Sequence, residues 1–180
     1  MHGTGYTILL EHLKVDPKKI PLCIETGTHL GFGAQQWSAF FDKVITIELS
    51  EELFKKALEN LDLKNVKFLN GLSHEVLAEI ISDITEPYML FLDAHGSGGD
   101  TTYDDKIGRY GSPVIQEIEA VADNLPELIV IDDLSDFFQI ESYPDPEKIV
   151  EAVSKIGDYS CHNIWGEAIH KGVLVFELNR

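Results

Sequence analysis

Five short apolar runs rich in Val, Ile, Leu and Phe recur along the first part of the chain. Segments of helical period separate them, and several of these open on a serine that we expect to cap a helix. Apolar strands that alternate with amphipathic helices are typical of an α/β fold with a buried parallel sheet. We expect strands at 20–25, 43–48, 65–70, 87–93 and 127–132, and serine-capped helices at 50–61, 73–84 and 112–125.

The pattern changes after residue 132. Residues 145–157 read as one more helix, and two apolar runs at 159–165 and 171–179 follow with only a short loop between them. This spacing predicts an antiparallel hairpin at one edge of the sheet. With 180 residues, of which 44% are hydrophobic, the chain can bury one core but is short for two. We therefore expect a single domain over 1–180, with a short helix around 7–14 at its start.

The charge balance excludes some partners. Lys and Arg number 14 against 31 Asp and Glu, which gives a net charge of −17. Such a chain repels phosphate, so we expect no nucleic-acid partner. No apolar run reaches the ~18 residues of a membrane span, and the start lacks the basic and apolar pattern of a signal peptide. These features predict a cytoplasmic protein with no membrane partner.

The stretch "CIETGTHLGFG" at 23–33 closes the first predicted strand. Gly27 would allow a sharp turn, and Gly31 and Gly33 would allow the backbone to approach a ligand or the next helix. Ligands of open parallel sheets bind beyond the carboxyl ends of the strands, where this stretch lies. The spacing G-x-x-x-G-x-G differs from the dinucleotide pattern G-x-G-x-x-G, which argues against nicotinamide or flavin. Glu48 ends the second strand, where a carboxylate can accept both hydrogen bonds of a ribose diol.

Taken together, Glu25-x-Gly27-x-x-x-Gly31, "VITIELS" with Glu48, and "LFLDAH" resemble the class I S-adenosylmethionine-dependent methyltransferases over nearly the whole chain. The resemblance implies a Rossmann-like doubly wound sheet of seven strands, mostly parallel, with an antiparallel C-terminal edge hairpin. It also implies that S-adenosylmethionine is the cofactor, its methionine part cradled by Glu25 and the glycine loop and its ribose held by Glu48. The cofactor contacts that we predict on this basis are Glu25, Gly27, Thr28, His29, Gly31, Glu48, Leu49, Ser73 and Asp93.

The chain departs from the family pattern at two positions. His29 stands where the family often has a middle glycine, which suggests a reshaped loop. Leu72 stands where an acid often follows the glycine after the third strand. The adenine contact is then left to Ser73 and backbone groups.

A second group of polar residues follows the fourth and fifth strands. Asp93 ends the fourth strand with His95 two residues on, and Asp132 and Asp133 end the fifth. Neighbouring parallel strands would bring these carboxylates to the same rim, where their oxygens suit Mg²⁺. The arrangement looks like the metal-dependent O-methyltransferases, especially the macrocin type, and predicts a metal site of Asp93, Asp132 and Asp133. A role in capping or in shaping a loop is the alternative.

Methyl transfer from a sulfonium is an in-line displacement, so the protein must align the acceptor and remove its proton. His95 is our candidate base, with Asp93 beside it, and the alternative is a solvated loop residue. The long irregular stretch 95–111, or a second subunit in a homodimer, would cover a small-molecule acceptor.

Three functions remain open at this point. The first is O-methylation of a small molecule with S-adenosylmethionine. The second is a metal-dependent hydrolase that uses the residues of the second group without a cofactor, which Glu25 and Glu48 argue against. The third is a catalytically degenerate binding protein of the same fold, which His29 and Leu72 favour.

Overall fold

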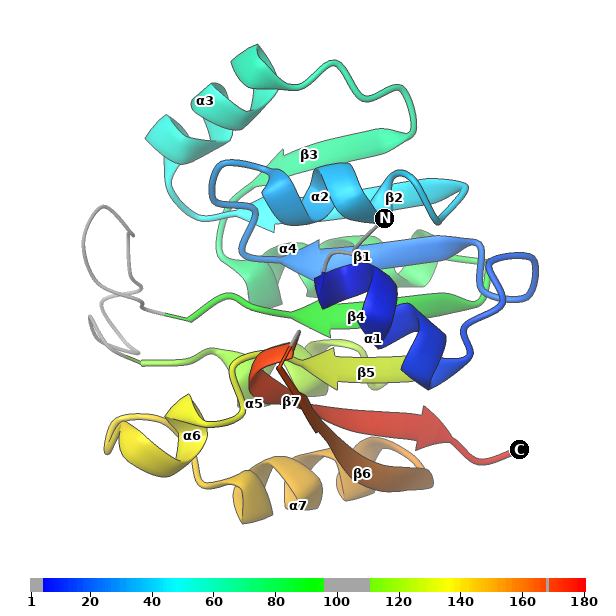
Figure 1. Cartoon of the computed structure of the whole chain (residues 1–180), viewed down its shortest axis with the longest axis vertical. Helices are drawn as coiled ribbons and strands as arrows, with labels where there is room; N and C mark the ends of the chain where they lie inside the picture. The colour runs from blue at the N-terminus through cyan, green and yellow to red at the C-terminus, as the bar shows by residue number, and fades with distance from the viewer. Residues whose placement is uncertain (1–4, 96–110, 168) are drawn as a thin grey trace.

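The strands form one sheet of seven, in the order β3-β2-β1-β4-β5-β7-β6 (Figure 1), in a computed structural model that describes residues 5–95, 111–167 and 169–180. The five neighbouring strands β3, β2, β1, β4 and β5 pair in parallel, whereas β7 is antiparallel to both β5 and β6. The predicted α/β fold, with its antiparallel C-terminal hairpin, is therefore confirmed.

The bounds of the strands agree with the apolar runs to within a few residues. The strands are β1 Leu22–Thr26, β2 Lys43–Glu48, β3 Val66–Asn70, β4 Tyr88–Leu92, β5 Leu128–Ile131, β6 Tyr159–Gly166 and β7 Ile169–Leu178. The helices are α1 Gly5–Leu13, α2 Phe32–Trp37, α3 Glu51–Asn60, α4 Ser73–Ile80, the 3₁₀ turn η1 Ile81–Asp83, α5 Val114–Ala120, α6 Asp136–Gln139 and α7 Pro146–Ile156.

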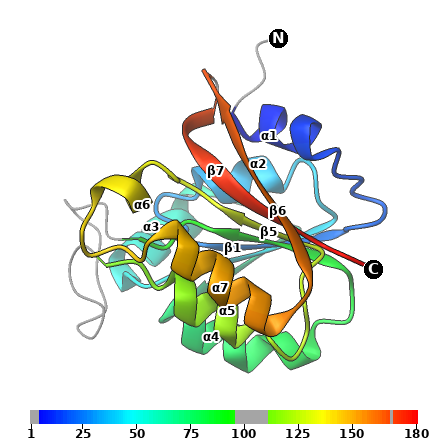
Figure 2. The same ribbon diagram turned by 90° about the horizontal axis from the view of Figure 1, so that it is seen from below.

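Helices cover both faces of the sheet (Figure 2). On one face α4, α5 and α7 bury Leu77, Ile118 and Ile149 against the strands. On the other face α1 and α2 bury Leu9 and Trp37 in a second apolar cluster. Every residue of β1, β4 and β5 is buried because these strands have neighbours on both faces, which explains the continuous apolar sequences of β4 and β5.

The register of the sheet brings four strand ends to one rim. Thr26 lies opposite both Ile47 and Leu92, and Leu92 lies opposite Ile131. The residues that follow these positions, at 27, 48, 93 and 132, are therefore neighbours on one edge. Figure 1 shows this edge on the left, where the arrowheads of β1, β4 and β5 point.

The predicted serine caps have different outcomes. Ser50 caps α3, since its hydroxyl accepts from the Leu53 N–H at 3.3 Å. The predictions for Ser73 and Ser112 were wrong, because α4 and α5 have Leu72 and Pro113 as their N-cap residues and no side-chain cap. The four-residue helix α6 was not predicted, because a single helical turn is too short to show periodicity.

No helix among the described residues has the length and apolar character needed to cross a membrane. Residues 96–110, which make up most of the long segment predicted to cover an acceptor, lie outside the described residues.

Candidate cofactor and transfer site

The turn after β1 needs Gly27 because of a neighbouring backbone. Gly27 has φ of 87°, and a Cβ placed on it would lie 2.5 Å from the carbonyl oxygen of Asp93. Its N–H donates to the Ile47 carbonyl at 2.9 Å. The glycine therefore lets the ends of β1 and β4 approach each other, so its missing side chain has a structural cause whether or not a ligand binds nearby.

The carboxylate of Glu48 joins two loops at the rim. It accepts the backbone N–H of His29 at 2.7 Å on one oxygen and that of Ser50 at 2.8 Å on the other. Burial raises the pKa of Glu48, although these N–H donors oppose the rise. His29 has φ of 50°, the left-handed conformation that glycine favours, so this departure from the family pattern does not by itself require a different loop path. Leu49, the residue after Glu48, is half-buried.

Glu25 is buried beneath the same loop. Its two oxygens accept from the Trp37 indole N–H at 3.0 Å and from the Thr46 hydroxyl at 2.6 Å. Thr46 in turn shares a 2.6 Å hydrogen bond with the hydroxyl of Thr28. Burial raises the pKa of Glu25 to about 8, although the two donors oppose it. A Cβ on Gly33 would lie 2.1 Å from Glu25 Oε1, so this glycine leaves room for the carboxyl group.

The predicted transfer residues meet at the ends of β4 and β5. His95 Nε2 lies 3.1 Å from Asp93 Oδ1 and 3.5 Å from Asp133 Oδ2. These are ion-pair distances, but neither imidazole nitrogen makes a well-aligned hydrogen bond with a described residue. Burial opposes a charge on His95, yet the surrounding carboxylates outweigh it and raise the pKa of the imidazole. Burial also raises the pKa of Asp93.

Lys171 completes this cluster and was missed by the sequence reasoning. Its Nζ lies 2.8 Å from Asp133 Oδ2 and 2.7 Å from Asp136 Oδ2. Burial opposes its charge, but the two carboxylates outweigh burial and raise the pKa of the lysine. A glycine directly after it, Gly172, was the available signal, because glycine inside a strand often marks an irregularity that redirects a side chain.

The structure does not support the expected Mg²⁺ site of Asp93, Asp132 and Asp133. No group of three His, Cys, Asp or Glu side chains within the described ranges is arranged to hold a metal ion. The physical reason is that His95 and Lys171 face the oxygens of Asp93 and Asp133, while Asp132 Oδ1 accepts the N–H of Asp133 at 2.8 Å. The metal-dependent hydrolase interpretation loses its support with this site.

Ser73 is buried and faces a carboxyl group that the sequence did not single out. The hydroxyls of Ser73 and Thr26 favour the charged form of Glu117, but burial outweighs them and raises the pKa of Glu117 to about 7. Glu117 Oε1 has no hydrogen-bond partner among the described residues. The predicted adenine contact at Ser73 stays a prediction.

Comparisons with known proteins give the fold but no close relative. No family model matches the sequence, and no curated protein matches it. A Staphylococcus aureus structure provisionally described as a caffeoyl-CoA O-methyltransferase is 18% identical, with a TM-score of 0.63 over 99% of this chain and 85% of that one. A Streptococcus mutans protein, provisionally described as a methyltransferase and solved with SAH, is 15% identical with a TM-score of 0.60 over 99% of this chain and 100% of that one. Aeropyrum pernix fibrillarin with bound S-adenosyl-L-methionine is 14% identical, with a TM-score of 0.62 over 95% of this chain and 72% of that one.

The chain has the class I methyltransferase fold. At these identities the comparisons speak for the fold alone, and they do not single out the macrocin type. The assignment of individual residues to cofactor and acceptor stays a prediction.

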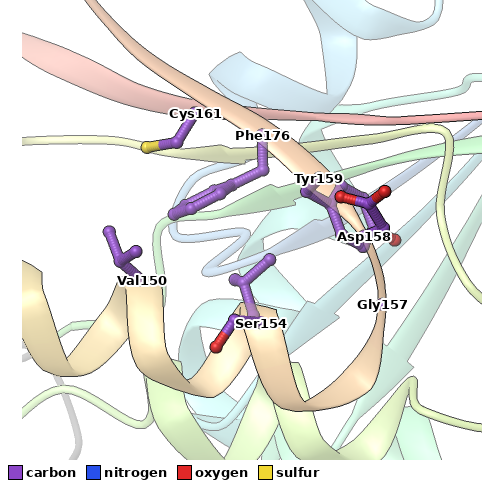
Figure 3. Close-up of a pocket in the computed structure, with 8 residues that line it drawn as sticks. Val150, Ser154, Gly157, Asp158, Tyr159, Cys161 and Phe176 are labelled. Atoms are coloured by element: carbon purple, nitrogen blue, oxygen red, sulfur yellow. The ribbon is translucent and has the colours of Figure 1, made fainter.

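A pocket of about 300 Å³ lies away from this rim, between α7 and the β6–β7 hairpin (Figure 3). Its lining includes Val150, Tyr159, Cys161 and Phe176. Phe176 lies opposite Ile129, toward the start of β5, whereas the rim begins where β5 ends. The pocket is therefore not part of the candidate site.

Proposed function

We propose that the chain is an S-adenosylmethionine-dependent methyltransferase that methylates an oxygen of a small molecule. The observation that carries this proposal is the pair of loops joined through Glu48 at the rim, next to the strand end that bears Asp93 and His95. The shared fold with proteins solved with SAH or S-adenosyl-L-methionine supports the choice of cofactor. Because the described strands all lie in one sheet, we also propose that 1–180 acts as one domain.

The cofactor would bind across the ends of β1 and β2. Glu48 already accepts one N–H on each oxygen, but a carboxylate oxygen has a further lone pair that can accept from a ribose hydroxyl. The turn at 27–31 would hold the methionine part, and Glu25 would act from beneath by supporting that loop through Trp37 and Thr46. The other proposed cofactor contacts are Thr28, His29, Gly31, Leu49 and Ser73, together with Asp93 at the end of β4.

When bound, S-adenosylmethionine supplies a methyl group on a positively charged sulfur. The acceptor oxygen would bond to that carbon as the carbon–sulfur bond breaks, and the acceptor proton must then leave. His95 is the proposed proton acceptor, and Asp93 would orient its ring from 3.1 Å. The imidazole can accept a proton only at a pH above its pKa, where it is neutral. The carboxylates raise that pKa, so His95 acts as a base only at a higher pH than an ordinary histidine.

The charge of the rim restricts the chemical class of the methyl acceptor. Four aspartates, at 93, 132, 133 and 136, lie around His95 and Lys171, and burial raises the pKa of Asp132 to about 7. Together with the net charge of −17, this disfavours phosphate-bearing acceptors such as nucleic acid. We therefore propose a neutral or cationic small molecule that carries a hydroxyl group.

Calorimetry with S-adenosylmethionine and SAH tests the proposal. Glu48→Gln should weaken binding by roughly 1–3 kcal/mol, because the ribose loses a charged acceptor. Glu52→Gln is the matched control, since Glu52 is an exposed helical residue with the same chemical change. No binding by the unaltered chain would refute the cofactor assignment. Binding without transfer of a labelled methyl group to any of a panel of small hydroxyl compounds would favour a degenerate binding protein.

A homodimer and a cytoplasmic location stay predictions. For the dimer we propose strand β6 as the contact, because it is a mostly exposed edge strand without a single Asp, Glu, Lys or Arg in a strongly acidic chain. Uncharged edges pair readily with another strand. Light scattering should then give a dimer for the wild type and for Asn60→Lys, an exposed control, but a monomer for Asn163→Lys. A monomeric wild type would refute this contact.

A further inference from the structure

Acidic and basic side chains alternate along a series of contacts at the ends of β4 and β5. Asp93 Oδ1 lies 3.1 Å from His95 Nε2, which lies 3.5 Å from Asp133 Oδ2. The same Asp133 oxygen lies 2.8 Å from Lys171 Nζ, which also lies 2.7 Å from Asp136. Asp133 and Asp136 thus face a positive group that the protein itself supplies, and Asp93 faces a basic imidazole.

The backbone at both ends of the Asp133–Lys171 ion pair is unusual. Asp133 has φ of 52° and Lys171 has φ of 62°, a left-handed conformation that residues with a Cβ seldom adopt. Backbone hydrogen bonds hold the two segments together, from Leu134 N–H to the Gly172 carbonyl at 3.0 Å and from Ser135 N–H to the Lys171 carbonyl at 2.9 Å. Such strain persists only where the surrounding structure enforces it. The fold therefore holds this lysine in place over the end of β5.

We infer that Lys171 supplies, from within the chain, the positive charge that a divalent cation supplies at a carboxylate metal site, and that it positions Asp133 beside His95. A divalent cation between Asp93 and Asp133 would lie close to the ammonium group of Lys171, and like charges repel strongly in a partly buried site. This disagrees with the metal dependence that the resemblance implies. The role of Lys171 in methyl transfer rests on the proposed function, whereas its replacement of a cation does not.

The test removes the charge of Lys171 and asks whether the carboxylates then take up a metal. Lys171→Met keeps the length of the side chain without its charge, and Lys171→Arg keeps the charge. Lys155→Met is the matched control, because Lys155 pairs with Glu151 on the exposed face of α7. Binding of Mn²⁺ to the full chain is followed by electron paramagnetic resonance, and thermal unfolding is measured in chelator and in excess Mn²⁺.

We expect no stoichiometric Mn²⁺ binding, and no Mn²⁺-dependent melting temperature, for the wild type, Lys171→Arg and Lys155→Met. Lys171→Met should melt roughly 2–8 °C lower in chelator, bind one Mn²⁺ and regain stability with it. The inference is overturned if the wild type binds Mn²⁺ and Asp133→Asn abolishes that binding. It is also overturned if Lys171→Met melts like the wild type and ignores Mn²⁺.

Should Lys171→Met fail to fold, the Mn²⁺ titration of the wild type and Asp133→Asn still decides between the two outcomes. S-adenosylmethionine calorimetry on the same wild-type sample separates this inference from the proposed function. A chain that binds neither cofactor nor Mn²⁺ would refute the proposed function and leave the role of Lys171 intact.

Discussion

Gly33→Ala tests whether the buried carboxyl group of Glu25 shapes the loop after β1. Gly33 lies in the first turn of α2 and has no positive φ, so alanine strains no backbone there. Its Cβ would, however, lie 2.1 Å from Glu25 Oε1, the oxygen that accepts the indole N–H of Trp37. Glu25 cannot keep that hydrogen bond and also make room, because the Thr46 hydroxyl holds its other oxygen at 2.6 Å.

The magnitude follows from two opposing terms. Breaking the hydrogen bond between Trp37 and Glu25 leaves buried polar groups unpaired, which costs about 1–3 kcal/mol. Alanine is better than glycine within a helix by about 0.5–1 kcal/mol. We expect a net loss of about 1–2 kcal/mol, which lowers the melting temperature of a domain of this size by roughly 2–8 °C.

The assay is thermal and urea unfolding of the full chain without cofactor. Gly166→Ala is the matched control, because a Cβ there would meet no described residue within 4 Å apart from its chain neighbours. In a Glu25→Ala background the penalty of Gly33→Ala should disappear, since the clashing oxygen is gone. The reasoning is refuted if Gly33→Ala is as stable as the wild type, or if its penalty persists without Glu25.

Three further predictions follow from the same geometry. Glu25→Gln should flatten the dependence of the free energy of unfolding on pH. Because the pKa of Glu25 is raised in the folded chain, its contribution to stability is full below the ordinary pKa of 4.5 and is lost as the pH rises through about 8, and urea unfolding across that range will check this. Gly27→Ala should cost roughly 2–3 kcal/mol even without cofactor, because its Cβ would meet the Asp93 carbonyl at 2.5 Å and its φ is positive; a stable variant that fails only to bind S-adenosylmethionine would contradict this. His95→Gln should remove a rise of the transfer rate with pH, a rise that we place above the ordinary histidine value of 6.5 because the carboxylates raise its pKa; an unchanged pH–rate profile would exclude His95 as the base.

Local patterns in the sequence were enough to predict the fold. Buried strands such as β4 and β5 are apolar at every position because helices cover both faces, so an apolar run in the sequence is enough to locate each of them. The parallel order then follows from the alternation with helices, and it brings the strand ends at 48, 93 and 132 to one rim. A polar residue directly after an apolar run was thus a sufficient signal for its place in the candidate site.

Which partners these residues have was decided only by the tertiary structure. Lys171 is 38 residues from Asp133 in the chain, and it reaches the rim because β7 runs antiparallel to β5 and carries two residues with positive φ at this point. In the same way Ser73, at the start of α4, lies near Glu117 of α5 and does not cap α4. Whether a carboxylate binds a metal, a cofactor or a lysine depends on which charges lie within a few ångströms of it. The sequence states each residue's chemistry, but only folding brings distant segments to that distance.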